Sequence, residues 1–269
     1  MHIINPPASR RLGGAALGAA LLMPLLLGAC GGNDAQFRQL QDEVRQLKEQ
    51  LDATQLRMTH IEDVKAIEKL TRAYGYYIDK GLWSQVVNLF AEDGTVQLGG
   101  EGIYKGREGV ARQFSMWFGK DMGRGPGKDG LAAGVLFNHP QFQGIVDVDA
   151  DGTTAHGRWR TLAQVAWQGR IAFWNEGVYE NEYVKEDGVW KFKHMKFWPT
   201  YFTLYNVGWD RQGVTEISRS ANTPNKEFPP DEPSPAQDTK SMYPEHYFVP
   251  PFHYPNPVTG TPVQSPGAP

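Results

Sequence analysis

The sequence predicts an α+β domain in which a cone-shaped, curved antiparallel sheet wraps over N-terminal helices. The first observation is the order of the patterns, because apolar residues at helical spacing come before any strand-like run. The second is a series of long runs with strand character, at residues 135–148, 154–167, 171–184 and 189–202. The third is a tight-turn sequence, Asp-Gly or Asp-Ala-Asp-Gly, after the first and third runs. Helices followed by hairpin-linked strands are typical of an α+β domain.

One helix is expected before Gly81 and one after it, because glycine commonly ends a helix. Each has one apolar face, formed by Ile67, Leu70, Tyr74, Tyr77 and Ile78 in the first helix and by Trp83, Val86, Val87 and Phe90 in the second. A third helix is expected over residues 107–118. Together with the strands, these helices define a domain over residues 62–210, which is long enough to have its own core.

Residues 1–29 have the pattern of a secretory signal peptide, because Arg10 and Arg11 precede a short apolar run. The run ends in Leu-Gly-Ala-Cys30, which resembles the lipobox of bacterial lipoproteins, where the cysteine is acylated. Cys30 is the only cysteine of the 269 residues. We therefore expect a periplasmic protein that is anchored by lipid on Cys30. Gly31 in place of an aspartate favours the outer membrane.

Residues 30–61 join the lipid anchor to the domain and contain an apolar stripe with heptad spacing. Its members are Phe37, Leu40, Val44, Leu47, Leu51, Thr54, Met58 and Ile61. The stripe is compatible with a coiled-coil stalk that makes a homo-oligomer, or with a single amphipathic helix that packs on its own domain. Its length is marginal for an independent coiled coil.

Composition excludes several classes of function. The formal net charge is −3 and no basic stripe is present, so nucleic acid is not an expected partner. The seven histidines are scattered without a chelating spacing, so we expect no metal site. No glycine-rich phosphate loop is apparent, and we expect no cofactor. A hydrophobic small molecule is the expected partner.

Tyr74, Asp79 and His139 are the candidate acid–base residues. A carboxylate and an imidazole that meet in a small aromatic-lined pocket can hold one tautomer and supply a general base. From residue types alone, a structural role is the more common one for such residues. Asp79 would then cap a helix or face solvent, and His139 would serve packing.

Four motifs follow one another in the chain: Tyr74-x4-Asp79-Lys-Gly-Leu-Trp83, Phe90-Ala-Glu-Asp-Gly, Tyr104-Lys-Gly-Arg-Glu-Gly and Tyr183-x3-Asp187-Gly-Val-Trp190-Lys-Phe192. In their order and spacing they resemble the SnoaL-like family of the nuclear transport factor 2-like superfamily. The resemblance covers residues 62–206 and implies an α+β cone with a deep apolar pocket. Scytalone dehydratase, the bile-acid dehydratases and hexachlorocyclohexane dehydrochlorinase are enzymes of this superfamily.

The resemblance implies a lyase that uses an Asp–His pair. Asp79 would accept a hydrogen bond from one ring nitrogen of His139, and the other nitrogen would remove a substrate proton. Tyr74 would donate a proton or a hydrogen bond to the leaving oxygen or to an oxyanion. The dehydrochlorinase carries cations where this chain has Tyr74 and Met195, so dehalogenation is not expected.

The expected reaction is dehydration or a retro-aldol cleavage of an aromatic or polycyclic hydrophobic molecule. The residues expected to bind that substrate are Tyr104, Arg107, Trp117, Phe137, Arg158, Trp159, Phe173, Trp198 and Tyr201. The two arginines fit an acidic substituent or a solvated surface, and the aromatic residues fit a pocket or plain core. The alternative function is a non-catalytic lipoprotein that binds an apolar ligand or scaffolds an envelope complex.

Residues 211–269, which we call the C-terminal strap, are rich in proline yet interleaved with aromatic residues. Disordered tails are usually poor in aromatic residues. The strap is therefore expected to be an extended segment that packs on its own domain or on a neighbouring copy.

Overall fold

The computed structural model describes residues 33–211, 223–239, 242–244 and 248–264. Cys30 and the predicted signal peptide lie outside these residues. The chain divides into two compact units, residues 1–53 and 54–269. The long helix α1 (Asn33–Ile78) supplies residues to both units. None of the described helices combines the length and the apolarity that crossing a lipid bilayer requires.

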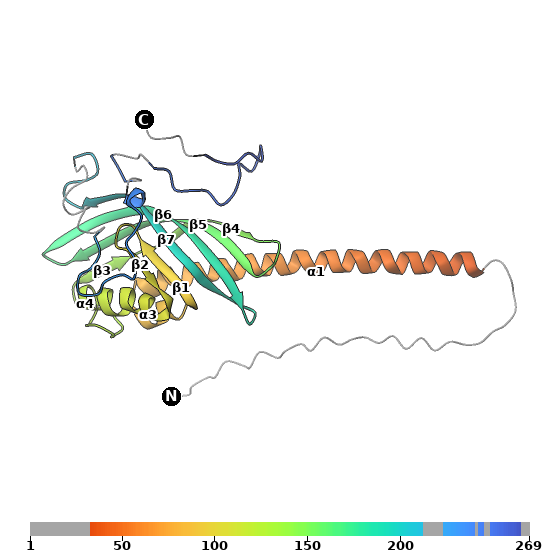
Figure 1. Cartoon of the computed structure of the whole chain (residues 1–269), viewed down its shortest axis with the longest axis horizontal. Helices are drawn as coiled ribbons and strands as arrows, with labels where there is room; N and C mark the ends of the chain where they lie inside the picture. The colour runs from red at the N-terminus through yellow and green to blue at the C-terminus, as the bar shows by residue number, and fades with distance from the viewer. Residues whose placement is uncertain (1–32, 212–222, 240–241, 245–247, 265–269) are drawn as a thin grey trace. The chain divides into compact units, whose positions relative to one another are not determined.

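The domain contains short helices and a seven-stranded sheet (Figure 1). The helical elements after α1 are α2 (Trp83–Val87), α3 (Gly106–Ala111), the π-helix η1 (Arg112–Phe118), α4 (Gly119–Asp121) and the 3-10 helix η2 (Ala236–Thr239). The strands are β1 (Phe90–Leu98), β2 (Ile103–Lys105), β3 (Val135–Asn138), β4 (Gln141–Val148), β5 (Thr154–Trp167), β6 (Ile171–Glu186) and β7 (Val189–Leu204).

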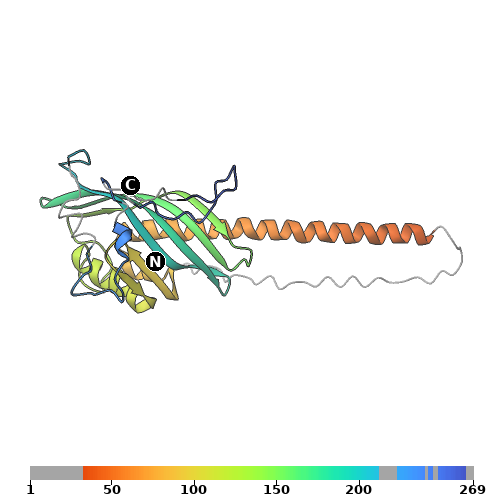
Figure 2. The same ribbon diagram turned by 45° about the horizontal axis from the view of Figure 1, so that its top comes forward.

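The sheet has the order β2-β1-β7-β6-β5-β3, and β4 also pairs with β5. All pairs are antiparallel except β1 with β7, which is parallel. The predicted α+β cone is thus confirmed, with one parallel pair in a sheet that was expected to be wholly antiparallel. Figure 2 shows the long strands β5, β6 and β7 curving together above the short helices.

The core lies between the sheet and the second half of α1. Ile67, Tyr74 and Ile78 of α1 are almost fully buried, as is Tyr179 of β6. The Thr71 hydroxyl forms a hydrogen bond with the Tyr183 hydroxyl at 2.8 Å, which ties the helix to the sheet. Thr71 and Tyr74 thus hold the C-terminal part of α1 against β6.

The predicted single strand over residues 135–148 is two strands, and His139 lies at the break. Pro140 follows it and has no N–H to donate to a ladder, so pairing stops there and resumes at Gln141. The predicted helix over residues 107–118 also differs, because its last seven residues form a π-helix. Turns of π-helix often occur at functional sites.

The apolar stripe of α1 is exposed within this chain, at Phe37, Leu40, Val44, Leu47, Leu51, Met58 and Ile61. Single exposed apolar residues are ordinary, but a continuous stripe with heptad spacing is typical of a helix–helix interface. The coiled coil itself stays a prediction.

Candidate active site

His139 is held in place through its backbone. The Asp79 carboxylate, just beyond the end of α1, accepts a hydrogen bond from the His139 backbone N–H at 2.5 Å. The α1 backbone also approaches closely here, since a Cβ on Gly75 would lie 3.2 Å from the His139 carbonyl oxygen. These contacts fix the main chain of residue 139 against the helix, and His139 as a whole is 6% exposed.

The ring of His139 has a different partner from the one expected. Its Nε2 lies 2.7 Å from the Tyr179 hydroxyl, which lies 3.3 Å from the Tyr74 hydroxyl. Its Nδ1 is buried and has no hydrogen-bond partner among the described residues. The predicted bond between the Asp79 carboxylate and the ring is therefore wrong, because Asp79 bonds the backbone N–H of His139 while the ring bonds Tyr179 of β6.

Burial governs protonation at this site. It lowers the pKa of His139 to about 4, so the ring is neutral at pH 7. Burial also raises the pKa of Tyr74 and of Tyr179 well above the ordinary value of a phenol. A neutral imidazole with a free nitrogen can accept a proton, and two protonated phenols can donate hydrogen bonds.

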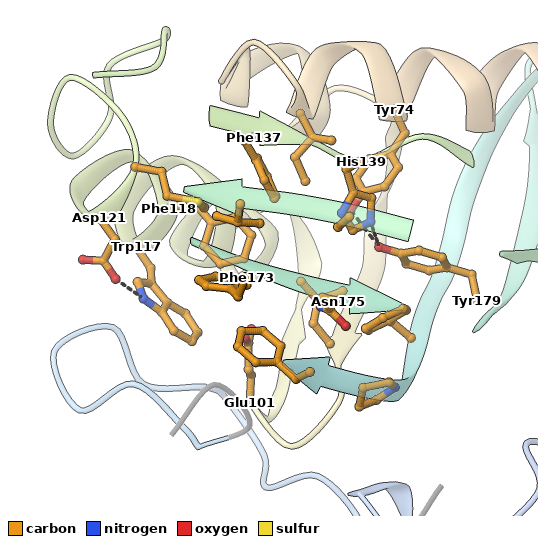
Figure 3. Close-up of a pocket in the computed structure, with 18 of the residues that line it drawn as sticks. Tyr74, Glu101, Trp117, Phe118, Asp121, Phe137, His139, Phe173, Asn175 and Tyr179 are labelled. Atoms are coloured by element: carbon orange, nitrogen blue, oxygen red, sulfur yellow. Dashed lines mark hydrogen bonds between the residues drawn. The ribbon is translucent and has the colours of Figure 1, made fainter. Parts of the chain in front are cut away.

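These groups face a cavity of about 190 Å³ (Figure 3). The aromatic residues that line it are Tyr74, Trp117, Phe118, Phe137, Trp167, Phe173, Tyr179, Phe197 and Phe202. The polar residues are Glu101, Asp121, His139 and Asn175. Of the described residues that line the cavity, none is a lysine or an arginine. The cavity therefore suits an uncharged aromatic molecule better than an anion.

Four polar residues of the cavity were not singled out from the sequence. Asn175 has a buried Oδ1 without a hydrogen-bond partner, and Asp121 accepts a hydrogen bond from the Trp117 indole N–H at 2.7 Å. Glu101, in the turn between β1 and β2, accepts one from the Gln113 amide at 2.6 Å. Burial raises the pKa of Glu101 to about 8. The fourth is Tyr179.

Among the residues predicted to bind substrate, Trp117, Phe137 and Phe173 line the cavity, as do Tyr74 and His139. The others do not, because each has a structural partner elsewhere. Tyr104 is buried and donates its hydroxyl to the Phe228 carbonyl oxygen of the strap. Arg107 is exposed and pairs with Glu92.

The remaining four residues that were predicted to bind substrate also lie outside the cavity. Trp159 is core, since its indole donates to the Tyr183 hydroxyl and covers Gly144. Arg158 precedes it and therefore points to the opposite face of β5. Trp198 donates to Asp238 of the strap, and the Tyr201 ring packs on Trp209. The side-chain alternation of β5 and β7, and the bulge in the β6–β7 ladder, decide these faces.

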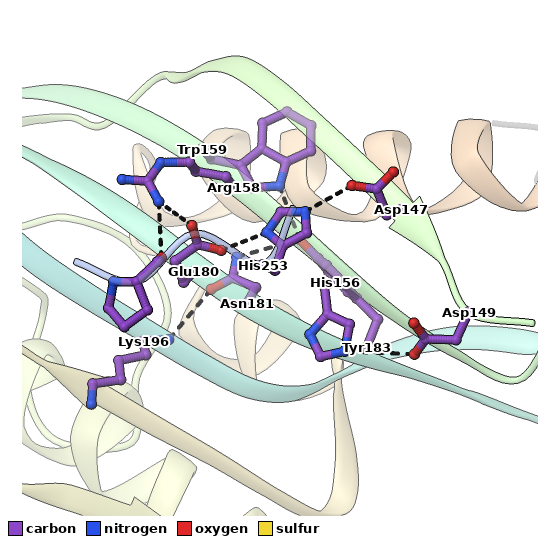
Figure 4. A network of polar contacts seen from close by, with 11 residues as sticks. Asp147, Asp149, His156, Arg158, Trp159, Glu180, Asn181, Tyr183, Lys196 and His253 are labelled. Carbon is purple, nitrogen blue, oxygen red and sulfur yellow. Dashed lines mark hydrogen bonds and ion pairs between the residues drawn. The ribbon is translucent and has the colours of Figure 1, made fainter. Parts of the chain in front are cut away.

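The outer face of the sheet carries a polar network of its own (Figure 4). The His253 ring, from the strap, lies between Glu180, at 2.7 Å, and Asp147, at 3.1 Å. Arg158 pairs with the same Glu180 and lies over the ring of Phe252, 3.8 Å from its centroid. This part of the strap thus packs on its own domain.

The model of the SnoaL-like domain matches residues 59–196, just over half of the chain. None of the curated proteins matches the sequence. Among solved structures, a putative scytalone dehydratase from Novosphingobium aromaticivorans is 25% identical, with 56% of this chain and 93% of that chain covered and a TM-score of 0.47. A type 3 hexachlorocyclohexane dehydrochlorinase from Novosphingobium barchaimii is 21% identical, with 55% and 93% covered and a TM-score of 0.46. By the match of the domain model, the chain belongs to the SnoaL-like family.

Proposed function

We propose that the domain is a cofactor-independent lyase in which His139 is the general base. One observation carries the proposal: Nδ1 of His139 has no hydrogen-bond partner among the described residues, in a cavity lined mainly by aromatic side chains. In the tautomer with its proton on Nε2, the ring donates to the Tyr179 hydroxyl and Nδ1 keeps a free lone pair. That lone pair accepts a proton from the substrate.

The properties of this base restrict the substrate. An imidazole whose pKa is lowered to about 4 is a weak base, so it removes only a proton that is already acidified. A carbon next to a carbonyl group carries such a proton. Tyr74 lines the same cavity and its hydroxyl can donate to the carbonyl oxygen, which stabilises the enolate as it forms. The substrate is therefore an aromatic ketone or a related carbonyl compound.

Size and charge restrict the substrate further. A cavity of about 150 Å³ takes a benzene molecule, so about 190 Å³ suits one substituted ring. The described residues that line the cavity offer no cation to hold a departing halide or an acidic group. The leaving group that fits is a hydroxyl group on the β-carbon, next to the carbon atom that carries the acidic proton. Loss of water from this β-hydroxyketone is the proposed reaction. Retro-aldol cleavage is the other outcome, in which His139 takes the proton of the hydroxyl group and the C–C bond between the two carbon atoms breaks.

The location and assembly of the protein are also proposals. The Leu-Gly-Ala-Cys30 sequence supports a lipid anchor in the periplasm, on the outer membrane. The exposed heptad stripe of α1 supports a homo-oligomeric stalk. Replacing Cys30 by serine should release the protein from the membrane fraction, and retention there would contradict the anchor.

The test of the reaction uses the purified full chain and the aldol of benzaldehyde with acetone, a β-hydroxyketone with one ring. Dehydration yields benzylideneacetone and retro-aldol cleavage yields benzaldehyde, so the products identify the reaction. Panels of diaryl diols and hydroxysteroids extend the search to larger substrates. We expect His139→Ala to lower kcat/KM by about 10²–10⁴-fold.

His60→Ala is the matched control, because His60 is an exposed histidine of α1. It should turn substrate over as the wild type does. Turnover that survives His139→Ala would refute the proposed base. Binding of these compounds to the wild type without any turnover would favour the alternative, a non-catalytic protein that binds an apolar ligand.

A further inference from the structure

We propose that Glu101 is a second catalytic residue, the general acid that protonates the leaving oxygen, and that the C-terminal strap positions it. The inference rests on the proposed lyase function and names the partner of His139 in that reaction. It assigns a chemical role to two parts of the chain that no motif identifies, the turn between β1 and β2 and residues 228–234 of the strap.

Glu101 faces the same cavity as His139 from a different element. Figure 3 shows the two residues on opposite sides of the cavity, with His139 between β3 and β4 and Glu101 in the turn after β1. An elimination can use this arrangement, because the proton and the leaving group depart from two adjacent carbon atoms. A base on one side and an acid on the other can serve both at once.

The Glu101 side chain is held by the π-helix. The Gln113 amide donates to Oε2 of Glu101 at 2.6 Å, and Gln113 itself is fully buried. One carboxyl oxygen is thus occupied by a neutral donor. The other oxygen of the carboxyl group remains to carry a proton toward the cavity.

The strap holds the turn that carries Glu101. The Ser234 hydroxyl accepts a hydrogen bond from the Gly102 backbone N–H at 3.0 Å and donates one to the Gly99 carbonyl oxygen at 2.8 Å. One serine therefore bridges the two sides of the turn. Beyond it, Ile103 forms an isolated antiparallel bridge with Glu232. These contacts fix the backbone of residues 99–103 from outside the matched domain.

Pro230 lies against the same turn. A Cβ on Gly102 would lie only 2.3 Å from the Pro230 ring, and the φ of Gly102 is +103°. Only glycine allows both the backbone conformation and the close approach of the strap. The turn and the strap are therefore shaped for each other.

Burial is the main cause that raises the pKa of Glu101 and favours its protonated form. The hydrogen bond from Gln113 acts against it, and the acidic neighbour Asp121 adds to it. Two basic groups of the neighbouring elements are already paired, Arg112 with Asp231 and Lys105 with Glu232. With a pKa of about 8 for Glu101 and about 4 for His139, the acid is protonated and the base is free at pH 7.

The step balances in atoms and electrons. Nδ1 of His139 takes the proton from the carbon next to the carbonyl group, and the electrons of that C–H bond pass into an enolate to whose oxygen Tyr74 donates. As the enolate collapses, its electrons form the new C=C bond and the carbonyl group is restored. The C–O bond to the leaving hydroxyl breaks, and its oxygen takes both electrons of that bond and the proton of Glu101. Water departs. A proton then passes through solvent from the imidazolium to the Glu101 carboxylate, which restores both groups.

The test compares two leaving groups in the full chain. The substrates are the aldol of benzaldehyde with acetone and its acetate ester, since acetate leaves without needing a proton. We expect Glu101→Gln to lower kcat for the hydroxyl substrate by about 10²-fold and to leave the ester much less affected. Glu108→Gln, an exposed glutamate of α3, is the matched control and should behave as the wild type.

The pH profile gives a second readout. The wild-type rate for the hydroxyl substrate should fall as the pH rises through about 8, because Glu101 loses its proton there. This alkaline limb should be absent for Glu101→Gln. Glu101→Asp keeps an acid on a shorter side chain, so it should retain an alkaline limb at a reduced rate. Circular dichroism checks that each variant is folded.

The outcomes separate this inference from the proposed function. If His139→Ala abolishes turnover while Glu101→Gln behaves as the wild type, the acid role is overturned and the base role stands. An equal loss for both substrates in Glu101→Gln would show a structural effect and would also overturn the acid role. A wild type that turns over neither substrate contradicts both proposals together.

Discussion

The Asp79 carboxylate and the His139 backbone N–H form a hydrogen bond of 2.5 Å, so the acid holds the main chain of the histidine and not its imidazole. This relationship changes what Asp79 does. A carboxylate on the ring would tune the base directly, whereas a carboxylate on the backbone only fixes where the base stands.

The role of Asp79 can be tested by two substitutions. Asparagine keeps an oxygen that can accept the backbone N–H, so Asp79→Asn should change kcat little. Asp79→Ala leaves a part-buried N–H unpaired and should lower the free energy of unfolding by about 1–3 kcal/mol. Urea unfolding and steady-state kinetics of both variants check this. A loss of about 10⁴-fold in kcat for Asp79→Asn is the effect expected of a carboxylate that holds a catalytic imidazole. That result would favour a hydrogen bond between the Asp79 carboxylate and the His139 ring.

His139 should make the protein less stable in acid. Its pKa is about 4 in the folded chain and about 6.5 in the unfolded chain, so between these values only the unfolded chain binds the proton. The free energy of unfolding therefore falls as the pH is lowered from about 6.5 to about 4, by roughly 3 kcal/mol.

Urea unfolding at a series of pH values measures the slope of the free energy of unfolding against pH. His139→Gln should flatten it, while the control His60→Ala should keep it. An unchanged slope in His139→Gln would show that other groups cause the acid sensitivity.

Glu101 should have the opposite effect. Burial raises its pKa to about 8, so between the ordinary pKa of a glutamate and about 8 only the folded chain binds the proton. Stability from this group is therefore lost as the pH rises through that window. Glu101→Gln should stabilise the protein relative to the wild type more at pH 8 than at pH 5. Thermal unfolding at the two pH values checks it, and an equal difference at both would contradict a protonated Glu101.

Gly102→Ala should loosen the strap. The new methyl group would meet the Pro230 ring, so the strap should move away and become easier to cleave by protease. Gly152→Ala is the matched control, because Gly152 also has a positive φ but a Cβ there would meet nothing within 4 Å. Limited proteolysis followed by mass spectrometry compares the two. Equal cleavage of the strap in both variants would show that the contact with Pro230 does not hold it.

The sequence predicts the fold well and the site in part. Helical and strand periodicities identify most elements, and the family motifs correctly bring Asp79 and His139 together. The hydrogen bond between the His139 ring and Tyr179 was not predicted. A 16-residue strand such as β6 offers residues on two faces, and spacing does not say which tyrosine reaches the histidine. Pro140 was the available signal for the break in the strand at His139.

Glu101 was missed for a different reason. A glutamate in a turn is normally solvated. Here the Gln113 amide holds the Glu101 carboxyl group, and a strap more than a hundred residues away in the sequence holds Gly99 and Gly102 of its turn. Trp159 and Trp198 were wrongly assigned to the pocket because aromatic residues are common in any core. Only the alternation and bulges of the long strands determine which of them face the cavity.

The bridge from Ser234 to the turn at Gly99 and Gly102 has a consequence for how the protein matures. Ser234 follows the last strand of the sheet, β7, and lies outside the matched domain. The strands can therefore pair without it, while the turn that carries Glu101 gains its bridge only when the strap docks. A chain cut before Ser234 would keep the histidine of the pocket and lose the contacts that fix the backbone beside the acid.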